Sequence, residues 1–116
     1  MNSRQKGARG ERMWRDQLRE NGWEARRGQQ FSGGADSPDV VCESLGWLHQ
    51  EVKCVERLNI EDAMAQARRD AQGKVPMVAH KRNHCDWLVT MDAATFFRFL
   101  RGDLPPQTST TNQKEA

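Results

Sequence analysis

Two acidic residues, Asp39 and Glu51, stand where the sequence predicts a pair of neighbouring strands. Residues 40–43 and 47–54 are strand candidates, and segment 44–46 has the length and the final glycine of a three-residue hairpin loop. With that loop Asp39 lies directly opposite Glu51, whereas a two-residue loop would shift the register and separate them. Like charges that face each other across two strands destabilise a sheet. The sequence therefore predicts that something positive lies between these carboxylates.

A divalent cation is one candidate for that charge, and Lys53, on the same face as Glu51, is another. A third acid, Glu11, falls on or beside the apolar stripe of a helix predicted over residues 4–21. A carboxylate on the packed side of a helix needs a partner. Arg12 or Arg15 could provide it, or Glu11 could point at the same cation as Asp39 and Glu51.

The residue types around these acids favour Mg²⁺, with Mn²⁺ possible, because hard ions need only one or two carboxylates beside water and phosphate oxygens. Cysteine and histidine ligands, which zinc prefers, are not expected in this centre. His80, His84 and Cys85 have ligand-like spacing, but no second cluster matches them. The alternative is a loop whose histidines contact phosphate, while Cys42 and Cys54 fill core positions.

Four short motifs follow one another in order along the chain. They are Lys-Gly-Ala-Arg-Gly-Glu-Arg at 6–12, Ser-Gly-Gly at 32–34, Pro-Asp-Val at 38–40 and Glu-Val-Lys at 51–53. Pro-Asp followed a dozen residues later by Glu-x-Lys gains specificity from the upstream glutamate helix and the Ser/Gly loop. The set resembles the PD-(D/E)xK nuclease superfamily and, within it, the archaeal-type and phage Holliday junction resolvases.

This resemblance implies a metal-dependent DNA endonuclease with a restriction-endonuclease-like core. The catalytic residues that it implies are Glu11, Ser32, Asp39, Glu51, Lys53 and Gln66. Asp39, Glu51 and the main-chain carbonyl of Val52 would hold the metal, and Glu11 would act through a water on the ion. Lys53 would orient the attacking water or stabilise negative charge in the transition state. Ser32 matches a serine near the scissile strand, and Gln66 matches a glutamine near the active site.

The elements that must position these residues read as one α/β domain. Besides the first helix, a weak strand is predicted within 23–29 and further strands over 75–79 and 87–91. Asn59 is a plausible N-cap for a helix that ends near Gly73, and Asp92 for a helix that stops at Gly102. We expect a mixed sheet flanked by helices over residues 1–103 and a disordered tail over 104–116.

Aromatic residues suggest both a core and a contact surface. We assign Trp14 and Trp87 to the core, because a small domain uses tryptophan mostly for bulk. In the last helix a stripe of apolar residues is expected to pack on the sheet, which leaves Phe99 without an internal partner. We therefore predict a homodimer through the apolar faces of this helix, whose large side chains are Phe96, Phe97, Phe99 and Leu100.

The charge is unevenly distributed although the formal net charge is only +2. Residues 1–30 and 67–116 are net basic, whereas residues 31–66 are net acidic. This pattern suits a protein that binds a polyanion together with a cation, although ordinary solvated charge also produces it. The residues that we expect to contact DNA are Arg4, Lys6, Arg9, Arg12, Lys81 and Arg82.

The preferred function is cleavage of branched DNA such as a four-way junction. The alternatives are a nuclease of the same superfamily without junction specificity, or a non-catalytic nucleic-acid-binding module. The sequence has no apolar run of the roughly 20 residues that cross a bilayer, and its three cysteines form no CxxC pair. We therefore expect a cytoplasmic protein without disulfides.

Overall fold

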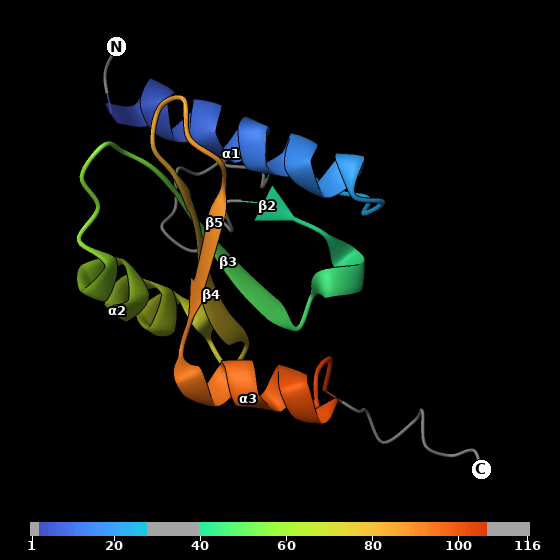
Figure 1. Ribbon diagram of the computed structural model, residues 1–116. Helices are drawn as coiled ribbons and strands as arrows, with labels where there is room; N and C mark the ends of the chain where they lie inside the picture. Colours follow the sequence, from blue (N-terminus) through green and yellow to red (C-terminus); the bar gives the residue numbers. More distant parts are fainter. Residues whose placement is uncertain (1–2, 28–39, 107–116) are drawn as a thin grey trace.

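The computed structural model describes residues 3–27 and 40–106, arranged as helices on a mixed sheet (Figure 1). The helices are α1 (Ser3–Glu20), α2 (Ile60–Ala71) and α3 (Ala93–Arg101), with a 3-10 helix η1 (Glu43–Leu45). The strands are β1 (Arg26–Arg27), β2 (Val40–Val41), β3 (Leu48–Cys54), β4 (Val75–Lys81) and β5 (Leu88–Met91). The predicted α/β class, with an N-terminal helix and a mixed sheet flanked by helices, is confirmed.

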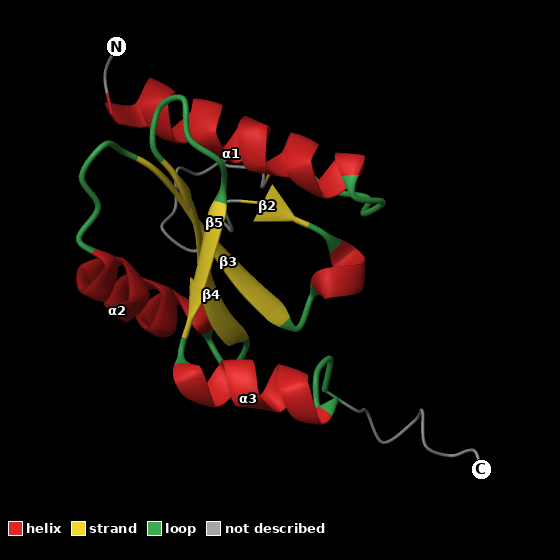
Figure 2. Cartoon of the chain, in the orientation of Figure 1, coloured by secondary structure: helices red, strands yellow, loops and turns green. Residues whose placement is uncertain are grey.

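The main sheet has the order β3-β4-β5. Strands β3 and β4 are parallel, with Glu51 beside Val78, and α2 is the crossover between them (Figure 2). Strand β5 returns antiparallel to β4 and pairs Thr90 with Val78. Within the described residues β3 is therefore an edge strand of this sheet, with its two faces covered by different helices.

The two faces are assigned by the alternation along β4. Met77 and Ala79 join the core formed by α1, whereas Val78 between them packs with α2. On the α1 side Trp14 is buried, and its ring lies 4.9 Å from the ring of the partly buried Trp87. Both tryptophans were predicted to lie in the core, and this prediction is confirmed.

Helix α2 follows its sequence pattern closely. The Asn59 side chain accepts a hydrogen bond from the Asp62 backbone N–H at 3.1 Å, as the predicted N-cap should. The apolar stripe is buried along its length, at Ala63, Met64, Ala67 and Ala71. Alanine predominates in this stripe and its small side chain lets the helix pack close to the sheet, so Gln66 beside the stripe reaches Lys53 on β3.

The predicted hairpin before β3 is wrong in the described residues. Val40–Val41 pairs with Arg26–Arg27 in a separate antiparallel ladder, and the segment before β3 forms η1. A three-residue hairpin loop needs a left-handed residue, but Gly46 has φ −64° and ψ −16°, which continues the helical turn. The cross-strand register that set Asp39 opposite Glu51 therefore does not form, and Asp39 itself lies outside the described residues.

The last helix, α3, also differs from its prediction. The stripe expected to pack on the sheet is exposed, with Phe96 49%, Phe97 52% and Leu100 66% accessible. Phe99, which was expected to lack an internal partner, instead has its ring 6.0 Å from that of Trp47. Thr95 is the buried residue of the helix. The stripe is exposed because α3 lies at one end of the sheet and does not cover either of the sheet's faces (Figure 1).

The start of α3 is held by an ion pair rather than by a side-chain cap. Asp92 occupies the N-cap position, but its carboxylate accepts hydrogen bonds from the Arg68 guanidinium of α2. This contact lowers the pKa of Asp92 below its ordinary value. Leu104, one residue beyond the predicted domain boundary, is buried, and residues 107–116 of the predicted tail lie outside the described part.

No helix among the described residues is long and apolar enough to cross a bilayer. The three cysteines, Cys42, Cys54 and Cys85, are free thiols, as predicted. Cys42 is buried in the core, whereas Cys54 is only partly buried.

Candidate active site

Strand β3 presents a carboxylate and an ammonium group toward α2. Alternation along the strand places Glu51 and Lys53 on one face, with Glu51 Oε2 3.7 Å from Lys53 Nζ. The Glu51 residue is only 4% exposed. A buried carboxylate is costly unless it is paired, so the lysine contributes to keeping this acid in place.

Helix α2 adds an amide to this pair. Lys53 Nζ donates a hydrogen bond of 2.9 Å to Gln66 Oε1, and Gln66 lies beside the buried stripe of the helix. The structure thus brings together Glu51, Lys53 and Gln66, three of the predicted site residues. The amide holds the ammonium group without neutralising its charge, which leaves that charge available to a phosphate.

A histidine that sequence reasoning missed completes the arrangement. His49 Nε2 lies 3.0 Å from Glu51 Oε1, so the two carboxylate oxygens are held by His49 on one side and Lys53 on the other. The sequence motif needs no histidine in this centre, but the structure places one against its carboxylate. The signal was available in the sequence, because His49 precedes Glu51 by two residues and a strand returns to the same face every second residue.

The donor set near Glu51 fits a divalent cation. Ligand atoms of His49, Glu51 and the exposed Asp70 on α2 lie within 4.8 Å of one another. Two carboxylates suit Mg²⁺ and Mn²⁺, whereas an imidazole beside them is a ligand that transition metals accept more readily than Mg²⁺ does. The residues present are therefore compatible with a divalent metal. The imidazole makes this centre more suitable for Mn²⁺ than a centre of carboxylates alone would be.

The other predicted site residues are placed as follows. Asp39 and Ser32 lie outside the described residues. Glu11 is half-buried on α1, and Val52 on β3 packs against the core on the α1 side. Of the predicted DNA contacts, Arg12 is exposed on α1, while Arg4 and Lys6 belong to α1 with side chains outside the described part.

The opposite face of β3 is joined to α1 by a buried hydrogen bond and a close approach. Trp14 Nε1 donates to Gln50 Oε1 at 2.8 Å, which satisfies both polar groups in the core. At Gly10 an added Cβ would lie 3.0 Å from Cys54 Sγ, so a larger residue would force this side chain or α1 to shift by a few tenths of an ångström. Sequence reasoning identified neither contact.

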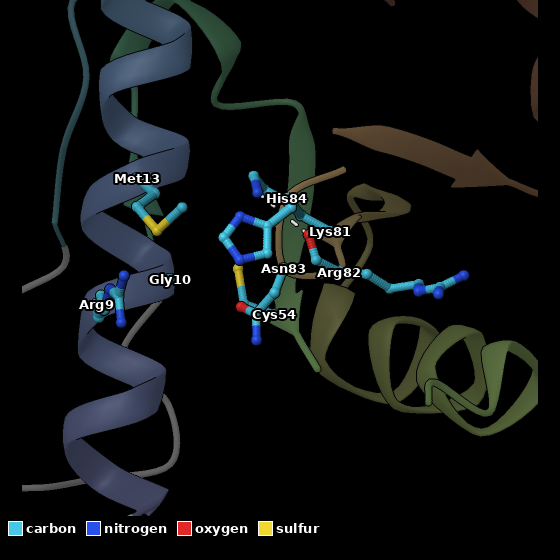
Figure 3. Close-up of a pocket in the computed structure, with 8 residues that line it drawn as sticks. All are labelled: Arg9, Gly10, Met13, Cys54, Lys81, Arg82, Asn83 and His84. Atoms are coloured by element: carbon cyan, nitrogen blue, oxygen red, sulfur yellow. Dashed lines mark hydrogen bonds between the residues drawn. The ribbon is translucent and has the colours of Figure 1, made fainter. Parts of the chain in front are cut away.

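A basic pocket lies between α1 and the turn after β4 (Figure 3). It has a volume of about 230 Å³ and is lined by Arg9, Gly10, Met13, Cys54, Lys81, Arg82, Asn83 and His84. Burial raises the pKa of the Cys54 thiol, and the positive charges of Lys81 and Arg9 partly oppose that rise. The structure thus brings together three predicted DNA-contact residues, Arg9, Lys81 and Arg82.

A zinc cluster of His80, His84 and Cys85, which their spacing left open, does not form in the described part of the chain. His80 Nε2 is 2.8 Å from Thr90 Oγ1, and burial lowers its pKa below the ordinary value. His84 instead lines the basic pocket, and Cys85 is exposed. The predicted loop is wrong for His80 and Lys81, which belong to β4 because the strand runs on beyond its apolar residues and pairs with β5, whereas Arg82 and His84 lie in the segment after it.

No protein-family model and no curated protein matches the chain. Among solved structures, the chain is similar to a Holliday junction resolvase. This structure is Archaeoglobus fulgidus Hjc, from an archaeal hyperthermophile, with 27% sequence identity and a TM-score of 0.49. The match covers 74% of this chain and 72% of that one.

Proposed function

We propose that this protein is a divalent-metal-dependent DNA endonuclease that hydrolyses phosphodiester bonds, with branched DNA such as a four-way junction as its substrate. The observation that carries the proposal is the buried Glu51 carboxylate, held between His49 and Lys53, with Lys53 fixed in turn by Gln66. Such an arrangement of charged groups is expensive to bury and is typical of catalytic centres.

The residues divide the work of hydrolysis among them. Glu51, together with Asp39 and the Val52 carbonyl, would hold the ion, which supplies an activated water and neutralises charge on the phosphoryl oxygens. Lys53 adds a positive point charge that would stabilise the transition state. The hydrogen bond to Gln66 holds the Lys53 ammonium group between β3 and α2. Glu11 from α1 would position a water, and Ser32 would contact the scissile strand.

The decisive experiment is cleavage of a synthetic four-way junction by purified protein with Mg²⁺, with Mn²⁺ and with EDTA. We expect cleavage with either ion and none with EDTA. A linear duplex of the same sequence serves as the control for junction preference, and equal cleavage of both would favour the nuclease without junction specificity. Metal-independent binding without cleavage would instead favour the non-catalytic module.

The Asp39 assignment is tested separately, because it rests on the sequence motif alone. Asp39→Asn should abolish metal-dependent cleavage while leaving junction binding intact or tighter, since the carboxylate both holds the ion and repels phosphate. Near-normal turnover of this variant would remove Asp39 from the metal site and would leave Glu51 unaffected.

We also propose that the protein acts as a homodimer through the exposed side of α3, the surface formed by Phe96, Phe97 and Leu100. These three neighbouring residues are between 49% and 66% exposed, and a protein surface rarely leaves a large apolar patch uncovered. Two copies related by a two-fold axis would carry two active sites, as paired cuts in a four-way junction require.

Light scattering tests this proposal, because it measures the molar mass and therefore the oligomeric state in solution. The parent should be a dimer at micromolar concentration, and Phe97→Glu or Leu100→Glu should give a folded monomer that does not make paired cuts. Phe99 is not the residue to change, because its ring contacts Trp47 and the variant would disturb the fold. A monomeric parent that still makes coordinated cuts would contradict the dimer.

A further inference from the structure

The basic pocket between α1 and the turn after β4 has a lining that suits an anion. Arg9 comes from α1, Cys54 ends β3, Lys81 ends β4, and His84 follows in the turn (Figure 3). No aspartate or glutamate lines it among the described residues. The charges of Arg9 and Lys81 both act on the Cys54 thiol, so two separate elements direct positive potential at one point.

The turn that closes the pocket is fixed before any ligand binds. Asn83 N–H donates to Glu56 Oε2 at 2.6 Å, and Cys85 N–H donates to the Arg82 carbonyl at 3.2 Å. Lys81 Nζ donates to the same carbonyl at 3.2 Å, whereas the Arg82 side chain extends away from α1 (Figure 3). Lys81 at the end of β4 and Asn83 and His84 in the turn therefore line the pocket with polar side chains, and the turn needs little further ordering on binding.

The size of the pocket limits its occupant. A volume of about 230 Å³ is below the roughly 300–1,000 Å³ of sites that enclose whole small molecules. A single phosphate group with part of its sugar fits such a space. Arginine binds phosphate through paired N–H donors and lysine through a point charge, and both are present.

The position of the pocket relates it to the candidate active site. Cys54 directly follows Lys53 on β3, and their side chains point to opposite faces of the strand. We propose that the pocket binds one backbone phosphate of the substrate DNA, with Arg9 and Lys81 as its charged ligands and His84 as a further donor. The DNA strand then crosses the end of β3, with the phosphate to be cleaved on one face and an anchoring phosphate on the other.

This inference rests on the proposed function for the identity of the polyanion, and free phosphate shares the same chemistry. A backbone phosphate is favoured because the site opens at the end of the strand that carries Glu51 and Lys53. The test therefore uses two probes: inorganic phosphate alone and a synthetic four-way junction in EDTA, where no cleavage occurs.

The variant is Arg9→Gln with Lys81→Gln, and the matched control is Arg69→Gln with Lys74→Gln, which removes the same charge from exposed positions outside the pocket. At about 0.1 M salt the pocket variant should bind the junction at least tenfold more weakly than the control. The slope of log affinity against log salt should fall by about 0.9, the value for one lost phosphate contact. Melting curves check both folds, and Arg9→Gln alone, an exposed helix position, provides a second variant.

Equal affinity and slope for the two double variants would overturn the proposal, as would failure of the parent to bind the junction. If phosphate binding requires the pocket but junction affinity does not, the occupant is free phosphate and the DNA assignment is wrong. Pocket-dependent binding without cleavage in Mn²⁺ would refute the proposed hydrolysis while the phosphate site stands. Cleavage that does not depend on the pocket residues would support the proposed hydrolysis and refute the phosphate site.

Discussion

The two faces of strand β3 carry side chains of opposite character. Toward α1 the strand contributes Gln50, Val52 and Cys54, which pack against Trp14 and the glycine at position 10. Toward α2 it contributes His49, Glu51 and Lys53, which form a chain of charged and polar contacts. Neighbouring residues of one strand thus belong to a packed core on one side and to a candidate reaction centre on the other.

The difference separates what stabilises the fold from what the fold is used for. The α1 face is satisfied internally, because its one buried polar pair, Trp14 and Gln50, is hydrogen-bonded at 2.8 Å. The α2 face buries the Glu51 carboxylate beside the partly buried Lys53, and apolar side chains of similar volume often replace a buried ion pair without loss of stability. Their presence is therefore best explained by chemistry, and the two faces should respond differently to substitution.

The largest effect is expected on the α2 face. Glu51→Gln should lower metal-dependent cleavage by about 10³-fold or more, because the metal contributes several kcal/mol to transition-state stabilisation. Stability should be unchanged, since the amide has the same shape and Lys53 keeps its bond to Gln66. Single-turnover cleavage and melting curves measure both, with the exposed Glu24→Gln as control. Turnover within tenfold of the parent would remove Glu51 from the centre.

The same carboxylate should couple the ion to stability. A ligand present at 100 times its dissociation constant adds roughly 2.7 kcal/mol to the free energy of unfolding. We expect millimolar Mg²⁺ or Mn²⁺ to raise the melting temperature of the parent and to leave that of Glu51→Gln unchanged. If neither ion moves the parent's melting curve and calorimetry detects no binding, the α2 face holds no metal.

Much of this arrangement could be predicted from local patterns. The period of two along residues 47–54 placed Glu51 and Lys53 together, and the Asn59 cap with its buried alanine stripe fixed the face of α2 that carries Gln66. These signals are strong because each depends on neighbours close in sequence.

The errors arose where a decision depended on backbone angles or on distant packing. At Gly46 the sequence allowed either a left-handed loop or a helical turn, and the hydrogen bonds of η1 selected the turn. In α3 the apolar stripe indicated burial, but periodicity cannot say whether the covering surface belongs to the same chain. The contact of Glu51 with His49 was missed because the motif was interpreted by residue type alone. The strand period, which places both residues on one face, was not applied to His49.

A smaller effect on the α2 face is expected at His49, whose imidazole holds Glu51 Oε1 at 3.0 Å. Partners that orient a metal-binding carboxylate are typically worth 10–100-fold in metal affinity or activity. His49→Ala should therefore weaken Mn²⁺ binding, measured by calorimetry, within that range. His49→Gln, which can still donate to the carboxylate, should recover part of it. Equal losses in both variants would indicate that His49 acts only as packing.

The smallest effect is expected where α1 packs on β3, and it is an effect on stability. Replacing a helix glycine by alanine normally stabilises by up to about 1 kcal/mol. At Gly7 nothing lies within 4 Å of the added Cβ, so Gly7→Ala should show this gain. At Gly10 the added Cβ would meet Cys54 Sγ at 3.0 Å, and overpacking of this kind costs roughly 1–3 kcal/mol. Gly10→Ala should therefore be less stable than Gly7→Ala by about 1–3 kcal/mol, because the two variants share the helix gain and differ by the overpacking cost.

Removal of the sulfur tests whether that contact is the cause. In the double variant Gly10→Ala with Cys54→Ala the clash with Sγ is gone, so the penalty of Gly10→Ala should be smaller in the Cys54→Ala background than in the parent. Denaturant unfolding of the parent, the two single variants and the double variant gives the coupling energy between the two positions. A Gly10→Ala variant as stable as Gly7→Ala would show that α1 can move away from β3. That result would contradict the close packing of α1 on β3 at Gly10.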